Sequence, residues 1–253
     1  MSVLNHHEIA LTLIGGPTLL IEVAGLRLLT DPTFDGPGAY QLGAITLTKT
    51  GHPVVAADAI GPIDTVLLSH DQHADNLDDA GRALLPTAKR VLTTRIGAER
   101  LGGKVEGLAP WQAVDLAPGV RVTATPARHG PVGIEPLTGD VVGFVVELDG
   151  QAIYVSGDTV WYEGVAEVAR RFDVRLAILF TGAARTRGAF HVTMDGNDAI
   201  KAAHAFADAR IVAVHNDGWA HFSESGEDLA QAFGVVGLGD RLVPLRHGER
   251  VLV

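Results

Sequence analysis

Residues 66–78, VLLSHDQHADNLD, carry the pattern that decides the fold of this chain. An apolar run over residues 65–68 predicts a short buried strand, and a polar cluster follows it directly. Within seven residues that cluster holds five side chains able to bind a metal ion, namely His70, Asp71, His73, Asp75 and Asn76. Open α/β sheets present functional groups at strand ends, so we interpret the cluster as a metal site. The alternative is a polar turn and helix start, with Asp75 or Asn76 as the N-cap.

Composition limits what kind of protein this is. The 253 residues suit one α/β domain spanning 1–253, and 47% hydrophobic with 20% charged residues is typical of a folded chain. No apolar run approaches the ~18 residues of a membrane span, and the start lacks the pattern of a signal peptide. We therefore expect a cytoplasmic protein with no membrane partner. The net charge of −10 argues against nucleic acid as a partner.

The chain contains no cysteine. This excludes disulfides, thiolate zinc sites and cysteine nucleophiles, and it leaves imidazole and carboxylate as the metal ligands.

Apolar periodicity predicts strands and helices along the whole chain. We expect strands at 8–14, 18–23, 26–30, 65–68, 90–94, 120–126, 141–148, 151–156, 175–180, 210–214, 241–245 and 250–253. Helices are expected from just after Asp75 to about residue 85, and at 96–101, 161–171 and 227–233. A further helix should end near residue 206, capped by Thr193 or Asp195. The Gly- and Pro-rich segment 33–62 is expected to be a long loop, with Lys49 and His52 at the surface.

Three more candidate ligands follow predicted strands. His129 stands in a Gly- and Pro-containing loop after 120–126, and His215 follows 210–214 directly. Asp158 lies in the segment SGDT after 151–156. A carboxylate there can give one oxygen to each of two ions, or it can cap the next helix.

This series resembles the metal motifs of the metallo-β-lactamase superfamily, which begin with His-x-His-x-Asp-His after a hydrophobic strand. The first motif departs from the family pattern. His70 has the family position next to the strand, but one extra residue separates it from His73. Counted back from His73, the first position is Asp71 and the last is Asn76. The opening strands, which end at Asp31-Pro32, are similar to those of the branch that includes L-ascorbate-6-phosphate lactonase and N-acylphosphatidylethanolamine phospholipase D.

The resemblance implies a four-layer αββα sandwich, an α/β fold with two mixed sheets between helices. It also implies one or two divalent ions, zinc or manganese, in two sites bridged by Asp158. One site would take His70 or Asp71 with His73 and His129, and the other would take Asp75, Asn76 and His215. We expect His70 to bind the ion and Asp71 to accept an N–H group from a ligand. The amide of Asn76 favours manganese over zinc.

The implied function is hydrolysis of a small-molecule lactone or phosphodiester by a metal-activated water. Asp75 would orient that water or carry its proton, and His191 would act as an acid, a substrate contact or a structural residue. The residues expected to contact the substrate are Arg128, Arg185, Trp219 and His221. The arginines could bind an anionic group of that substrate. The alternative for each arginine is an ordinary surface position. A different class of function is a binding or regulatory module on a decayed hydrolase scaffold. The sequence does not determine the oligomeric state, and a homo-oligomer is one of the possibilities.

Overall fold

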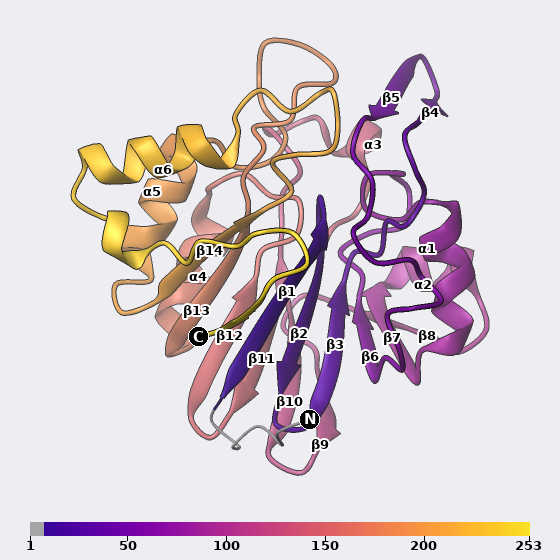
Figure 1. Ribbon diagram of the computed structural model, residues 1–253, viewed down its shortest axis with the longest axis horizontal. Coiled ribbons are helices and arrows are strands. Elements are labelled where there is room, and N and C mark those ends of the chain that lie inside the picture. The colour runs from indigo at the N-terminus through magenta and orange to yellow at the C-terminus, as the bar shows by residue number, and fades with distance from the viewer. Residues whose placement is uncertain (1–7) are drawn as a thin grey trace. The chain divides into compact units, whose positions relative to one another are not determined.

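The computed structural model describes residues 8–253 (Figure 1), and they divide into two compact units. The first unit comprises the described residues up to Leu108, together with Gly218–Ala220 and Leu245–Val253. The second unit comprises Ala109–Asp217 and His221–Pro244. The single domain expected over 1–253 stays a prediction.

The first unit contains a seven-stranded sheet in the order β15-β1-β2-β3-β6-β7-β8. Its strands are β1 (Ile9–Gly15), β2 (Thr18–Val23), β3 (Leu26–Thr30), β6 (Thr65–Leu67), β7 (Arg90–Thr94), β8 (Val105–Leu108) and β15 (Arg250–Leu252). β15, β1, β2 and β3 pair antiparallel, whereas β3, β6, β7 and β8 pair parallel. Helix α1 (Asp79–Leu84), the short 3-10 helix η1 (Leu85–Thr87) and helix α2 (Arg95–Leu101) connect the parallel strands. The parallel half matters for function because its strand ends meet at one edge.

The segment 33–62 is not the plain loop expected from its Gly and Pro content. It contains an antiparallel hairpin of β4 (Gly38–Leu42) and β5 (Ile45–Lys49), joined by the two residues Gly43 and Ala44. Gly43 has a positive φ of 58°, the conformation that such a tight turn requires. Lys49 is buried in this hairpin, so its expected surface position is wrong, whereas His52 is exposed as expected.

The second unit contains a six-stranded sheet in the order β14-β13-β12-β11-β10-β9. Its strands are β9 (Ala113–Ala117), β10 (Val120–Pro126), β11 (Val142–Leu148), β12 (Gln151–Val155), β13 (Val174–Phe180) and β14 (Arg210–Val214). The pairing from β9 to β12 is antiparallel, and from β12 to β14 it is parallel. Strands β10, β12, β13 and β14 therefore all run in the same direction, and their carboxyl ends share one edge.

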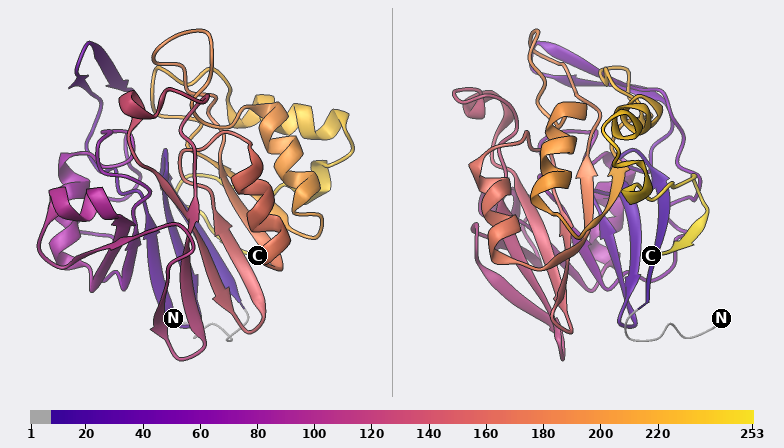
Figure 2. Two further views of the ribbon diagram at one scale, coloured as in Figure 1. Left: turned by 180° about the vertical axis from the view of Figure 1, so that it is seen from behind. Right: turned by 90° about the vertical axis from the view of Figure 1, so that its left-hand side faces the viewer.

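Helices α4 (Glu163–Arg171), α5 (Gly196–Ala205) and α6 (Gly226–Val235) pack on the sheet of the second unit (Figures 1 and 2). Alternate residues of β13, Ala177 and Leu179, share a buried cluster with Val165 of α4, Ala202 of α5 and Phe233 of α6. This alternation is the period-two burial of a strand that is covered on that face by helices. The unit also contains the short helix α3 (Glu135–Thr138) and the 3-10 helix η2 (Gly239–Arg241).

The strand expected at 241–245 is wrong. The segment makes one isolated bridge, Leu242 to Ile211, and the Val243 amide donates to the Ile211 carbonyl. The Arg241 guanidinium binds the backbone carbonyls of Ala203 and Ala209, around the end of α5. Arg241 thus holds this segment at the C-terminal end of a helix, where cations are favoured. The segment does not form the hydrogen bonds of a β-sheet strand.

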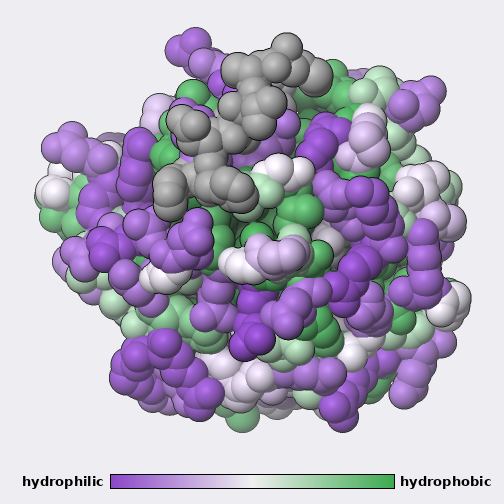
Figure 3. Space-filling view, turned by 90° about the horizontal axis from the view of Figure 1, so that it is seen from below, coloured by the Kyte–Doolittle hydropathy of each residue, from purple (hydrophilic) through white to green (hydrophobic). Residues whose placement is uncertain are grey.

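The surface is predominantly hydrophilic on the face shown in Figure 3, with small apolar areas between polar side chains. Among residues 8–253, no helix is both long enough and apolar enough to cross a membrane.

Candidate metal centre

The carboxyl ends of β3, β6 and β7 meet at one edge of the sheet in the first unit, because these strands are parallel. His70 follows β6 in a turn-rich segment, and its side chain is fully buried at 0% exposure. The polar cluster anticipated from the sequence is therefore held against the sheet core and not on the outer surface.

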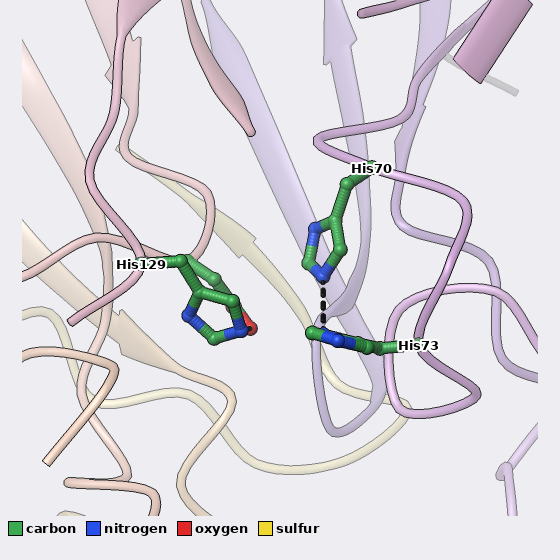
Figure 4. A group of neighbouring side chains, drawn as sticks. His70, His73 and His129 are labelled. Atoms are coloured by element: carbon green, nitrogen blue, oxygen red, sulfur yellow. Dashed lines mark hydrogen bonds and ion pairs between the residues drawn. The ribbon is translucent and has the colours of Figure 1, made fainter. Parts of the chain in front are cut away.

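His70 and His73 point their ring nitrogens toward each other (Figure 4). Nε2 of His70 lies 2.9 Å from Nδ1 of His73, with the rings edge to face and their centroids 4.8 Å apart. The other nitrogen of His70, Nδ1, lies 2.8 Å from the hydroxyl of Ser69. A second hydrogen bond of this kind fixes the ring orientation of metal-binding histidines.

Asp31 is a residue of this site that the sequence analysis noted only as part of the Asp-Pro pair that ends the opening strands. It follows β3, is 1% exposed and has a positive φ of 25°, which is strained for a residue other than glycine. Its carboxylate accepts the Ser69 amide at 2.5 Å and lies 3.4 Å from the Asn76 amide nitrogen. Asp31 thus fixes both ends of the ligand segment, and the signal for it was the Asp-Pro pair at a strand end.

Asp71 does not contact either imidazole. Its carboxylate pairs with both Nε and Nη2 of Arg100 on α2, and Arg82 donates to its backbone carbonyl at 3.1 Å. The expectation that Asp71 accepts an N–H from a ligand is therefore wrong. Since its two oxygens already bind a guanidinium, the contacts favour His70 for the first ligand position.

Asp75 and Asn76 are not helix caps. Asp75 is 5% exposed and lies in a turn in which the Asn76 and Leu77 amides donate to the His73 carbonyl. Helix α1 begins only at Asp79, and its N-cap is Asp78, whose side chain accepts the Gly81 amide at 2.8 Å. Asp75 and Asn76 are thus left on the turn between the histidines and the helix.

Asp78 also anchors the ligand segment to the β4–β5 hairpin. Its carboxylate accepts the amides of Phe34 and Asp35 at 2.9 and 2.7 Å, and the Lys49 ammonium at 2.8 Å. The Lys49 and Asp78 side chains are 5% and 0% exposed, so this is a buried ion pair. Sequence reasoning missed it because the partners lie 29 residues apart.

In the second unit, His129 follows β10 and is 5% exposed. Its Nδ1 lies 2.8 Å from the backbone carbonyl of Val192. A carbonyl oxygen can only accept, so Nδ1 carries the proton and the neutral ring has its lone pair on Nε2. This is the tautomer that a metal-binding histidine needs.

Asp158 follows β12 and directs its two oxygens to two different imidazoles. Oδ2 lies 3.6 Å from Nε2 of His129, and Oδ1 lies 3.3 Å from Nε2 of His215. Charge-assisted hydrogen bonds are shorter, about 2.7–2.9 Å. Ligand atoms around a tetrahedral ion with bonds of about 2.1 Å are separated by about 3.4 Å. The residues present therefore fit a divalent cation.

Asp158 is also not a helix cap, because α4 begins at Glu163 and its N-cap position is Tyr162. The alternative of a capping role for Asp158 is thereby wrong.

His215 follows β14 in a strained backbone conformation, with φ of 56° and 0% exposure. Its ring lies between Phe180 and Phe222, with centroids 5.2 and 4.7 Å away. Gly182 passes so close to the His215 carbonyl that a side chain at position 182 would collide with it. Left-handed backbone of this kind costs about 1–3 kcal/mol and is typical of functional sites.

His191 lies between two carboxylates of the same unit. Its Nε2 is 3.1 Å from Asp198 and its Nδ1 is 3.5 Å from Asp195, the observed N-cap of α5. The hydrogen bond to Asp198 raises the pKa of His191, and the neighbouring carboxylates add to that effect. Asp198 also accepts the Trp161 amide at 2.9 Å. These contacts favour the structural role over that of an acid.

The four expected substrate contacts lie in different surroundings. Trp219, in the first unit, is buried against Tyr40 with ring centroids 5.5 Å apart. In the second unit, Arg185 is exposed, and its amide donates to the carbonyl of the half-buried His221 at 3.0 Å. Arg128 is half-buried beside His129.

Comparisons with known proteins agree with one another. The family model described as a β-lactamase superfamily domain matches residues 26–216. A UPF0173 metal-dependent hydrolase from Opitutus terrae is 32% identical over 216 residues, which are 81% of this chain and 83% of the relative.

Two solved structures are similar over almost their full length. A possible metal-dependent hydrolase from Veillonella parvula has a TM-score of 0.85 at 22% identity, covering 96% of this chain and 99% of that chain. The isothiocyanate hydrolase from Delia radicum gut bacteria has a TM-score of 0.84 at 24% identity, covering 96% and 98%. At these identities the likeness is one of fold.

Proposed function

The chain belongs to the β-lactamase superfamily, and from this premise we propose that it hydrolyses a small-molecule lactone or phosphodiester with the help of bound metal. The expected metallo-β-lactamase fold, with two mixed sheets and helices, is confirmed. Membership of a family of metal-dependent hydrolases supports the reaction class. The choice of lactone or phosphodiester rests on the resemblance of the opening strands to one branch of the superfamily.

The observation that carries the proposal is the carboxylate of Asp158 between two imidazoles. Nδ1 of His129 donates to the Val192 carbonyl, so in the neutral ring the lone pair lies on Nε2, which faces Oδ2 of Asp158 at 3.6 Å. Two acceptors that face each other in a buried site repel unless a cation lies between them. The donor set contains nitrogen and oxygen without sulfur, which suits zinc or manganese.

The family resemblance implies that His70, His73 and Asp75 of the first unit would also hold metal. When bound, a divalent metal would acidify a water molecule and polarise the carbonyl or phosphoryl oxygen of the substrate. Asp75 accepts the proton that this water loses as its oxygen attacks the carbonyl carbon or phosphorus. As the ester bond breaks, the proton held by Asp75 would pass to the oxygen of that bond, which becomes a hydroxyl group.

Metal content and a substrate panel test the proposal. Protein purified without added metal is measured by elemental analysis and then assayed with zinc or manganese on lactones, phosphodiesters and an isothiocyanate. We expect one or two ions per chain and hydrolysis of a lactone or a phosphodiester. A protein that contains no metal, and that no metal activates, would instead be a binding or regulatory module.

Asp158→Asn provides the matched variant test. It removes the negative charge from between His129 and His215 and should lose at least one ion and nearly all hydrolysis, with the fold retained by circular dichroism. Asp173→Asn is the control, because Asp173 is about half exposed and pairs with the exposed Arg175 in the same unit. Full metal content and full rate in Asp158→Asn would refute the assignment.

A further inference from the structure

Arg128 is fixed at the backbone between two of the assigned ligands. It directly precedes His129, and its amide donates to the Thr159 hydroxyl at 3.0 Å. Its carbonyl accepts the Val160 amide at 2.9 Å. These two bonds join the segment after β10 to the segment that carries Asp158, so residue 128 cannot move independently of the ligands.

The guanidinium of Arg128 lies on an aromatic face and not against an anion. Its central carbon is 4.6 Å from the ring centroid of Tyr162, within the range of a cation–π contact. Its Nε is buried without a hydrogen-bond partner among the described residues. No carboxylate of residues 8–253 forms an ion pair with it. A half-buried cation without a counterion is unfavourable, and an anionic ligand would supply the missing charge.

Other arginines of the same unit show the usual arrangement. Arg121, Arg170 and Arg175 pair with Asp115, Glu163 and Asp173 respectively. These pairs are surface contacts of neighbouring side chains. Arg128 differs from these arginines because its guanidinium contacts an aromatic ring and pairs with no carboxylate of the described residues.

Tyr162 is itself held in place by the start of α4. Its phenol ring folds back over Gly164, where a side chain would collide with the ring. Burial raises the pKa of Tyr162 to about 12, so the phenol is neutral near pH 7. A glycine early in a helix costs about 1 kcal/mol relative to alanine, and here it leaves room for the ring.

We infer that Arg128, held over the ring of Tyr162 beside His129, binds an anionic group of the substrate, a carboxylate or a phosphate. This inference rests on the proposed function, because it places the anion next to the metal ligands. A planar guanidinium offers two parallel N–H groups to such an anion, and the aromatic face keeps the plane oriented. The substrate class is then a lactone or phosphodiester that carries a further negative charge.

Anion binding by calorimetry tests the inference independently of hydrolysis. Inorganic phosphate and acetate are titrated into the full-length protein as purified and after chelation of metal, with circular dichroism to verify folding. In the chelated protein, the response to either anion does not depend on metal or on turnover. Failure of the proposed function would therefore leave this measurement intact.

Four variants and one control define the result. Arg128→Gln should lower the affinity for the anion that the wild type binds by at least tenfold. Arg128→Lys should lower this affinity less, since the positive charge remains. Tyr162→Leu and Gly164→Ala should each lower affinity several-fold, because both remove the ring from beneath the guanidinium. Arg175→Gln removes an exposed charge of the same sign and should leave affinity unchanged.

The two anions distinguish the two sources of charge. Tighter binding of phosphate supports a phosphorylated substrate, and equal or tighter binding of acetate supports a carboxylate. The inference is overturned if the chelated wild type binds neither anion, or if folded Arg128→Gln and Arg128→Lys both bind as tightly as the wild type.

Discussion

Replacing Asp78 by asparagine should be among the most destabilising single changes in the first unit. The change leaves the Lys49 ammonium, 5% exposed, without the carboxylate 2.8 Å away. Breaking a buried ion pair from one side costs about 3–5 kcal/mol, because the remaining charge is uncompensated. Lys49→Met should cost less, roughly 1–2 kcal/mol, because Asp78 still accepts the amides of Phe34, Asp35 and Gly81.

The double variant Lys49→Met/Asp78→Asn removes both charges and should be more stable than Asp78→Asn alone. Urea unfolding, followed by tryptophan fluorescence in a Trp111→Phe/Trp161→Phe background, measures these differences. The remaining indole, Trp219, lies in the first unit, and its ring centroid is 5.6 Å from Lys49 Nζ. Its fluorescence therefore reports unfolding of the unit that contains the substitutions.

Lys89→Met is the matched control, because the Lys89 side chain is 73% exposed in its pair with Asp64. Such a surface pair contributes at most about 1 kcal/mol. A cost below about 1 kcal/mol for Asp78→Asn, or a double variant as unstable as the sum of the two single variants, would refute the reasoning.

In a metal titration, His70→Ala should lose binding outright, whereas Asp71→Asn should weaken it much less, because the Asp71 carboxylate contacts Arg100 and neither imidazole; the opposite ranking would make Asp71 the ligand. The hydrogen bond with Asp198 is the main cause of the raised pKa of His191. The raised pKa contributes to the free energy of unfolding, and this contribution is fully present below pH 6.5, the ordinary pKa of histidine. This contribution is lost as pH rises through the raised pKa, so His191→Gln should flatten the decline of unfolding free energy above pH 6.5; an unchanged slope would disprove it. Gly81→Ala should lower stability by about 2 kcal/mol or more, because its side chain would collide with the Pro32 carbonyl; a melting temperature equal to that of the wild type would show that the backbone yields there.

The strand ends that carry the candidate ligands were predictable, because each follows an apolar strand. A strand buried on both faces leaves a continuous hydrophobic run in the sequence, and the first polar residue after it marks the sheet edge. His129, Asp158 and His215 each stand shortly after a predicted strand, and β10, β12 and β14 run in the same direction, so their carboxyl ends share one edge of the sheet.

Partners that come from distant parts of the chain were not predictable. The carboxylate of Asp71 is bound by Arg100, 29 residues away, and nothing in the local pattern indicates that pairing. The contact of Arg128 with Tyr162 likewise depends on how the segments after β10 and β12 approach each other. Local sequence patterns report strand ends, whereas ion pairs and ring contacts depend on tertiary packing.

The wrong predictions of secondary structure have local physical causes. The strands of the β4–β5 hairpin are short and largely exposed, so they lack the buried apolar run by which other strands were recognised. The expected strand at 241–245 has an apolar pattern, but Arg241 binds carbonyls near the end of α5 and Pro244 cannot donate to a ladder.

The pairing of β1 with β15 has a consequence for how the chain is made. Ala10 pairs with Leu252, so the edge of β1 stays uncovered in the nascent polypeptide until residues 250–252 have been synthesised. Until then the backbone N–H and C=O groups along that side of β1 are open to pairing with other chains. Contacts of such long sequence separation form slowly. Newly synthesised molecules should therefore be most prone to aggregate while translation is still in progress, and slower elongation should lengthen that interval.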